Sequence, residues 1–206
     1  MEAYDKVITA NVSNTDYAAF QKAISYGIVD RVPKKIEALN AFITHYPKSN
    51  LREDAIYELA NTYVGQGKME KASELYEMLQ SQYQEGPYTA RAMLREGLML
   101  YNKNENQKAL AIFKKITQKY PSSPEAMQAV SSAKNIYAEM GKMEEYAAWA
   151  KGLGYVKVSD SEIDSAAFDA AERLYVQNKK QEAKVALEKY LKDYPKGTGA
   201  SQAEFY

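Results

Sequence analysis

Residues 92–121 read AMLREGLMLYNKNENQKALAIFKKITQKYP, and this stretch predicts two amphipathic helices joined by a tight turn. In the first half, Leu94, Leu98 and Tyr101 share one helix face because they are three or four residues apart. Asn104 follows, and asparagine readily adopts the left-handed backbone conformation that ends a helix. A second apolar stripe then consists of Ala109, Ile112, Phe113 and Ile116. The stretch therefore indicates a helix–turn–helix unit that closes at Tyr120-Pro121.

The same unit recurs along the chain with a period of 37 residues. A column of small residues consists of Ala18, Ala55, Ala92, Ala129, Ala166 and Ala203. A turn column consists of Asp30, Gly67, Asn104, Gly141 and Asn178. An anchor column of large residues consists of Tyr26, Tyr63, Leu100, Tyr137 and Leu174. A fixed period that carries a packing residue, a turn residue and an anchor predicts an all-α repeat array.

This period predicts one solenoid domain over residues 1–206, because stacked repeats share a continuous core. The expected helix pairs are 16–47, 53–84, 90–121, 127–158 and 164–195, with partial helices at 1–10 and 201–206. Natural arrays end in capping repeats with a polar outer face, and neither terminal segment has that character. We therefore expect a fragment of a longer array, whose uncapped ends can self-associate.

Composition argues against several classes of function. The 27 basic residues balance the 27 acidic ones, whereas a nucleic-acid binder normally carries a basic surplus. The chain has no cysteine for a thiolate metal site, and no apolar stretch long enough to insert into a membrane. Its one histidine, His45, falls at a predicted helix end, where an imidazolium interacts favourably with the helix dipole. With no catalytic motif present, we predict a non-enzymatic protein without cofactor or metal.

The fourth repeat is the least regular. Gly152 and Gly154 cut its second helix short, and Tyr155–Asp160 form a longer connection. Such a connection is either tolerated surface or a functional loop, and the unchanged register at Ala166 favours the first. Trp149 is expected to pack against the neighbouring repeat, with a binding hot spot as the alternative.

The repeat resembles the tetratricopeptide repeat, a helix–turn–helix unit that is usually 34 residues long. The matching residues of the second period are Leu59-Ala60, Tyr63, Gly67, Ala72, Tyr76 and Leu79. The resemblance implies a right-handed α-solenoid that binds proteins or peptides. The Tyr-Pro-x-Ser segments at 46–49 and 120–123 look like the longer variety of bacterial cell-envelope proteins, such as outer-membrane assembly lipoproteins and Tol-associated coordinators. This likeness implies a periplasmic or envelope location.

The resemblance also implies a concave groove lined by first-helix residues. The candidate partner-binding residues are Tyr57, Asn61, Leu94, Leu98, Tyr101, Asn135, Phe168 and Tyr175. The set is rich in aromatics, which supply contact area, and in asparagine, which can bond a peptide backbone. The Lys and Asn pair with which some family members clamp a peptide carboxylate has no counterpart here. We predict an interaction scaffold for a peptide or protein; the alternatives are a small-molecule or glycan groove, or a segment serving mainly self-association.

Overall fold

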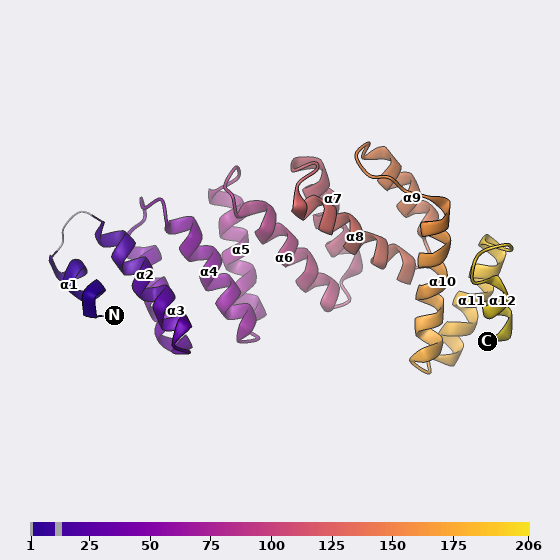
Figure 1. The fold of residues 1–206 in the computed structure, drawn as a ribbon, viewed down its shortest axis with the longest axis horizontal. Coiled ribbons are helices and arrows are strands. Elements are labelled where there is room, and N and C mark those ends of the chain that lie inside the picture. The colour runs from indigo at the N-terminus through magenta and orange to yellow at the C-terminus, as the bar shows by residue number, and fades with distance from the viewer. Residues whose placement is uncertain (1, 11–13) are drawn as a thin grey trace. The chain divides into compact units, whose positions relative to one another are not determined.

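The computed structural model describes residues 2–10 and 14–206, and all regular structure in these ranges is α-helical (Figure 1). The helices are α1 (Glu2–Ala10), α2 (Thr15–Ile28), α3 (Val32–His45), α4 (Arg52–Gly65), α5 (Met69–Gln82), α6 (Thr89–Asn102), α7 (Asn106–Lys119), α8 (Pro124–Glu139), α9 (Met143–Gly152), α10 (Asp160–Val176), α11 (Lys180–Asp193) and α12 (Ala200–Phe205). The predicted all-α fold class is confirmed.

The chain divides into two compact units, Met1–Glu96 and Gly97–Tyr206, with the boundary inside α6. In the first unit α1 packs on α2, α2 pairs with α3, and α3 packs on α4, which pairs with α5. In the second unit α8 contacts α7, α9 and α10, while α11 lies between α10 and α12. Each unit is therefore built by neighbouring helices along the chain, as repeat architectures are.

The five residues of the turn column all have a positive φ, as their residue types predict. The angles are 53° at Asp30, 69° at Gly67, 60° at Asn104, 64° at Gly141 and 60° at Asn178. At each turn the following amide donates to the carbonyl of the anchor column; the Lys142 amide, for example, lies 2.8 Å from the Tyr137 carbonyl. This is the Schellman pattern, which satisfies the last carbonyls of the first helix. It explains why the turn and anchor columns share one period.

Close packing of the helices depends on the small-residue column and on Gly97. Ala18, Ala55, Ala92 and Ala129 of the small column are buried. Gly97 on α6 faces Phe113 on α7, and a Cβ at Gly97 would stand 2.5 Å from a ring carbon of Phe113. A larger residue at Gly97 would force the two helices of this repeat apart.

A buried carboxylate fastens the loop between α11 and α12. Asp164, 8% exposed, accepts hydrogen bonds from the Tyr190 hydroxyl at 2.5 Å and from the Thr198 amide at 2.7 Å. Because Asp164 belongs to α10 and Tyr190 to α11, the first bond joins the paired helices and the second ties α10 to the loop that ends the repeat.

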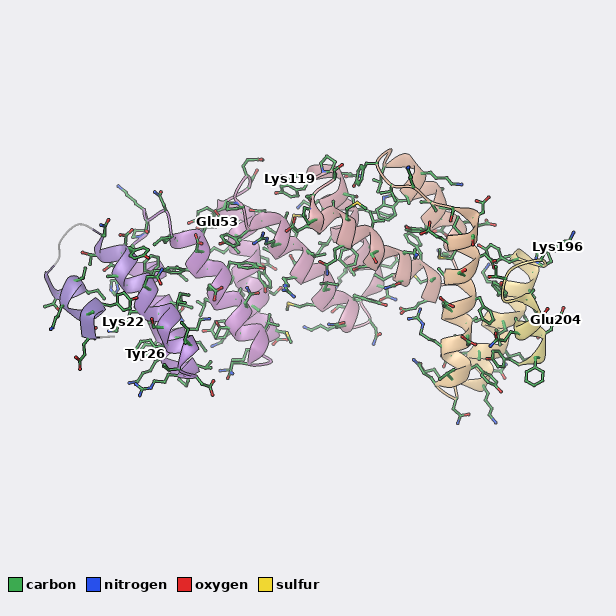
Figure 2. The ribbon with its side chains drawn as sticks, viewed as in Figure 1. Lys22, Tyr26, Glu53, Lys119, Lys196 and Glu204 are labelled. Carbon is green, nitrogen blue, oxygen red and sulfur yellow. The ribbon has the colours of Figure 1, made fainter. Side chains whose placement is uncertain are left out.

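The same column position carries an acid in two other repeats. Glu53 on α4 (Figure 2) accepts a hydrogen bond from the Tyr88 amide at 3.0 Å. Asp16 on α2 accepts one from the Ser49 hydroxyl at 2.6 Å. In these repeats, an acid near the start of the first helix therefore holds the loop that follows its own repeat.

The fourth repeat departs from the others where the glycines indicated. Its second helix, α9, has 10 residues, whereas α3, α5, α7 and α11 have 14 each. Gly154 has a φ of 73°, and α10 then begins at Asp160 after a capping box formed by Ser159 and Glu162. The helix start therefore comes four residues earlier than the predicted boundary at 164.

Trp149 packs mainly within its own repeat. Its ring lies 6.3 Å from that of Tyr137 and 6.1 Å from that of Tyr146. The Lys114 ammonium, from the preceding repeat, stands 5.9 Å from the Trp149 ring and 5.5 Å from the Tyr137 ring. The tryptophan is thus a packing residue, held by its own repeat and by one lysine of the neighbouring one.

Candidate functional site

Two predicted site residues, Tyr57 and Asn61, lie on α4 and are half-buried in the first unit. The Tyr57 ring stacks on Tyr88 with centroids 4.7 Å apart. The Asn61 side-chain oxygen accepts a 2.9 Å hydrogen bond from the Tyr76 hydroxyl. The Tyr57 ring also lies 6.4 Å from the ring of Tyr76, so most of its aromatic contacts are made inside the protein.

Tyr88, which precedes α6, is itself held by polar contacts. Its hydroxyl donates to Asp54 at 2.8 Å, and this bond, together with burial, raises the pKa of Tyr88 to about 12. The Arg91 guanidinium lies 5.8 Å from the Tyr88 ring. Tyr57, Tyr88 and Arg91 therefore form one stack that spans α4 and the start of α6.

The three predicted residues of α6 differ in exposure. Leu94 is buried, whereas Leu98 and Tyr101 are half-buried. The Tyr101 hydroxyl donates to Glu139 of α8 at 2.6 Å, and burial together with this bond raises the pKa of Tyr101 to about 12. Arg173 of α10 lies 3.9 Å from the same Glu139 oxygen. Tyr101 thus belongs to a polar chain across three first helices of the second unit.

The structure places Phe168 in the core of the second unit and leaves Tyr175 at its surface. Phe168 packs with Leu187 and Tyr190, and a Cβ at Gly199 would lie 2.3 Å from its ring. Its ring is therefore covered by the loop after α11, which removes it from the expected groove. Tyr175 is 42% exposed and stacks on Tyr206 at a centroid distance of 4.1 Å.

Asn135 stands in a polar hollow of about 420 Å³ between α8 and α10. On α8 the hollow is lined by Ser131, Lys134, Asn135 and Ala138, whose spacing places them on one helix face. On α10 the lining residues are Ser161, Glu162, Ser165, Ala166, Asp169 and Arg173. Two consecutive first helices, α8 and α10, therefore line this hollow, and its lining residues include no aromatic side chain.

The polar groups of the hollow have unused hydrogen-bonding capacity. Among residues 2–10 and 14–206, no hydrogen bond engages the side chains of Ser131, Asn135, Ser161 and Ser165, while Lys134 interacts electrostatically with Glu162. Arg173 and Lys134 balance Glu162 and Asp169, so the charges cancel. An amide, three hydroxyls and one ammonium can then bind a polar ligand from two sides.

Sequence reasoning missed the charged residues of this hollow. Lys134 lies one position before Asn135, and Asp169 one position after Phe168, so both fall just outside the expected spacing. The predicted set of partner-binding residues therefore contains none of the four charged residues that line the hollow. The sequence does contain a pattern that indicates this stripe: polar residues 161, 165, 169 and 173 are spaced four positions apart and therefore share one face of α10.

We also searched the described residues for a metal site and for a membrane-spanning helix. Over residues 2–10 and 14–206, no three His, Asp or Glu side chains gather as a metal site would require. Over the same residues, no helix combines the length and apolar character needed to cross a bilayer. His45 is exposed at the last position of α3, where the sequence placed it.

Comparison with protein families agrees with the repeat pattern. Models of the tetratricopeptide repeat match residues 57–124 and residues 166–197. Both segments are tetratricopeptide repeats. This family commonly mediates protein–protein interaction, and its helix pairs coincide here with α4–α7 and α10–α11.

Solved structures share the tetratricopeptide solenoid fold at low sequence identity. YrrB, described as a TPR protein with an unusual peptide-binding site, is 14% identical with a TM-score of 0.56, covering 99% of this chain and 98% of that one. The C-terminal part of a TPR repeat-containing protein from Cytophaga hutchinsonii is 13% identical, with a TM-score of 0.61 and coverages of 98% and 76%. MamA is 14% identical, with a TM-score of 0.57 and coverages of 90% and 94%. No curated protein matches the chain.

Proposed function

We propose that this chain is a non-enzymatic interaction scaffold that binds an extended segment of a protein partner along the first helices of its repeats. The observation that carries the proposal is the hollow between α8 and α10, whose serine hydroxyls and Asn135 carboxamide form no hydrogen bond with the described residues. An extended peptide exposes an amide and a carbonyl at every residue, so it can satisfy several such groups at once.

Asn135 has the central role in this proposal. Its carboxamide can donate to a peptide carbonyl and accept from a peptide amide, which neither serine nor lysine does alone. Ser131 and Ser165 approach from the two walls and extend the contact along the peptide. In the first unit, the Asn61 amide nitrogen and the stacked Tyr57 ring offer a similar polar and aromatic combination.

Selection from a random-peptide phage library tests this proposal even while the natural partner is unidentified. Peptides that bind the immobilised protein are synthesised, and their affinity is measured by fluorescence anisotropy. Asn135→Ala should weaken binding about fivefold, because one or two hydrogen bonds to the peptide are lost. The matched control is Gln181→Ala on α11, an exposed amide outside the hollow, and it should leave the affinity unchanged.

Two outcomes would contradict the proposal. Selected peptides that bind the wild type, Asn135→Ala and Ser165→Ala with equal affinity would place recognition elsewhere on the molecule. A library that yields no binding peptide, while a small polar molecule or glycan shifts the amide resonances of Asn135 and Ser165, would favour a ligand groove instead.

We also propose a cell-envelope location, on the basis of the Tyr-Pro-x-Ser segments. In the structure, Ser49 of the first such segment donates to Asp16, so this motif closes the loop between the first and second repeats. Fractionation of the native cells, followed by immunodetection, tests the location. Recovery with the cytosolic fraction alone would contradict it.

A further inference from the structure

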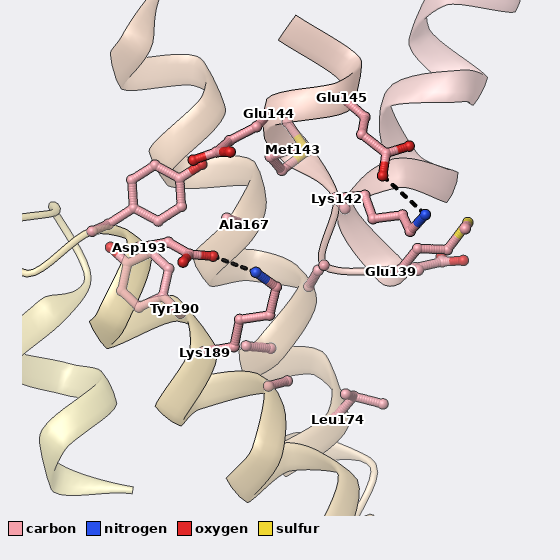
Figure 3. A pocket seen from close by; sticks show the side chains of 17 residues that line it. Glu139, Lys142, Met143, Glu144, Glu145, Ala167, Leu174, Lys189, Tyr190 and Asp193 are labelled. Atoms are coloured by element: carbon pink, nitrogen blue, oxygen red, sulfur yellow. Dashed lines mark hydrogen bonds and ion pairs between the residues drawn. The ribbon is translucent and has the colours of Figure 1, made fainter.

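A second pocket lies on the side of α10 that faces away from the polar hollow. It has a volume of about 350 Å³ and lies between the start of α9, the middle of α10 and the second half of α11 (Figure 3). On α10 its lining residues are Ala167, Ala170, Ala171 and Leu174, whereas the hollow uses residues 161, 162, 165, 166, 169 and 173. One helix therefore presents a polar stripe on one side and an apolar stripe on the other.

The floor of this pocket is apolar because its side chains are small. Ala167, Ala170 and Ala171 of α10 and Ala186 of α11 leave space that larger residues would fill, and Met143 adds an apolar edge. Such a floor offers no hydrogen-bonding partner, so an occupant has to contribute an apolar stem there.

The rim is charged, and four carboxylates outnumber two ammonium groups. Lys142 pairs with Glu145 at 2.9 Å, and Lys189 pairs with Asp193 at 2.5 Å; Figure 3 shows both pairs at the rim. Glu139 is engaged with Tyr101, which leaves Glu144 as the rim carboxylate without a partner among the described residues. Both lysines are thus neutralised, and the rim keeps a negative balance.

The carboxylate of Glu144, which has no ion pair among the described residues, lies on the α11 side of the pocket. Figure 3 shows the Glu144 carboxylate reaching from α9 toward the side of α11 that carries Asp193 and Tyr190. Tyr194 lines the same region. Burial raises the pKa of Tyr194, and the charges of Asp193 and Glu144 raise it further. Because Lys189 already pairs with Asp193, an added positive charge on this side is attracted chiefly by Glu144.

We propose that this pocket receives a lysine side chain from a protein partner, with its methylene stem on the alanine floor and its ammonium group against Glu144. A lysine fits because it carries a charged end on a flexible apolar stem. The Tyr190 and Tyr194 rings line the pocket and add aromatic surface beside that stem. The pocket and the polar hollow lie on opposite sides of α10. Occupation of the pocket by the lysine side chain therefore leaves the hollow accessible.

The probe is the pentapeptide acetyl-Ala-Ala-Lys-Ala-Ala-amide, and its matched control has norleucine in place of lysine. Binding is followed by NMR through the methyl groups of Ala167, Ala170 and Ala171. The lysine peptide should shift these resonances and bind at least about fivefold more tightly than the norleucine peptide, as expected for one partly screened ion pair. Added salt should reduce this preference.

Glu144→Gln supplies the decisive comparison. This variant keeps the size of the side chain and removes its charge, so the preference for lysine over norleucine should fall to near unity. Glu188→Gln, an exposed carboxylate on α11 outside the pocket, should leave the preference unchanged. Asn135→Ala should also leave it unchanged, which separates this site from the polar hollow.

Three results would overturn the inference. Equal binding of the two peptides would show a purely apolar site, and an unchanged preference in Glu144→Gln would remove the assigned carboxylate. Binding of free butylammonium ion but not of the lysine peptide would show a small-molecule site in place of a protein docking site.

Discussion

The Tyr190 hydroxyl donates a 2.5 Å hydrogen bond to the carboxylate of Asp164, and it also accepts one from the Gly199 amide at 3.0 Å. The two side chains come from the paired helices α10 and α11, and both bind the backbone of the loop that follows α11. Together they fix where α12 begins. They also bring Gly199 close enough to cover the ring of Phe168.

Asp164→Asn should destabilise the protein by about 2 kcal/mol, because a charge-assisted hydrogen bond becomes a neutral one in a buried site. Denaturation by urea, followed by circular dichroism, measures this loss. Asp169→Asn is the matched control, since Asp169 lies on the same helix and is exposed. A stability change of equal size in both variants would show that helix charge, and not the loop contact, is responsible.

Asp164 should also contribute to the pH dependence of stability. Burial alone would raise the pKa of Asp164, but hydrogen bonds from Tyr190 and Thr198 outweigh burial and lower it. Because the folded pKa lies below the unfolded value of about 3.9, the contribution is complete above that value and is lost as the pH falls through the folded pKa. The difference in Tm between wild type and Asp164→Asn should therefore shrink below about pH 4. A constant difference over that range would contradict this assignment.

Asn104→Val should cost about 1–2 kcal/mol, because a β-branched residue is strained at the φ of 60° observed there. Asn102→Val gives the comparison, because Asn102 is an exposed helical residue two positions earlier. There the same change should cost only a few tenths of a kcal/mol, from helix propensity. Thermal unfolding of both variants measures the contrast, and equal costs would argue against backbone strain at the turn.

Gly97→Ala should destabilise the protein by about 1–3 kcal/mol, because the added methyl group would stand 2.5 Å from the Phe113 ring. Gly65→Ala provides the opposite case. Gly65 ends α4, and a Cβ there meets no atom within 4 Å, so alanine should stabilise by about 0.5 kcal/mol. Two Tm shifts of the same sign would contradict the packing explanation for Gly97.

The turns could be predicted from the sequence because their cause is local. A positive φ and its Schellman hydrogen bonds involve six consecutive residues, so the residue type at Asn104 or Gly141 carries the information. The loop contacts could not be predicted in this way. Asp164 meets Thr198 across 34 positions, and residue identity alone does not show which loop a carboxylate will bind.

The candidate site was predicted in part for a similar reason. Asn135 stands in the hollow because helix periodicity fixes its face on α8. Tyr57 and Phe168 lie on first helices, but Tyr88 and Gly199 contact their rings from loops that the period does not describe. The apolar pocket was missed because it results from the placement of α9, and a lone sequence shows only that this helix is short.

Ser159 and Glu162 cap α10 through contacts within its first turn, so the start of this helix does not depend on the segment before it. That segment runs from Gly154 to Val158. Met127 occupies the column position that Asp164 and Glu53 fill in their repeats, so this connection lacks the carboxylate that holds theirs. Changes in chain length should therefore accumulate here among natural relatives. Tyr155 donates to the Thr117 carbonyl at 3.2 Å, so a reporter peptide is best inserted after the exposed residue Lys157.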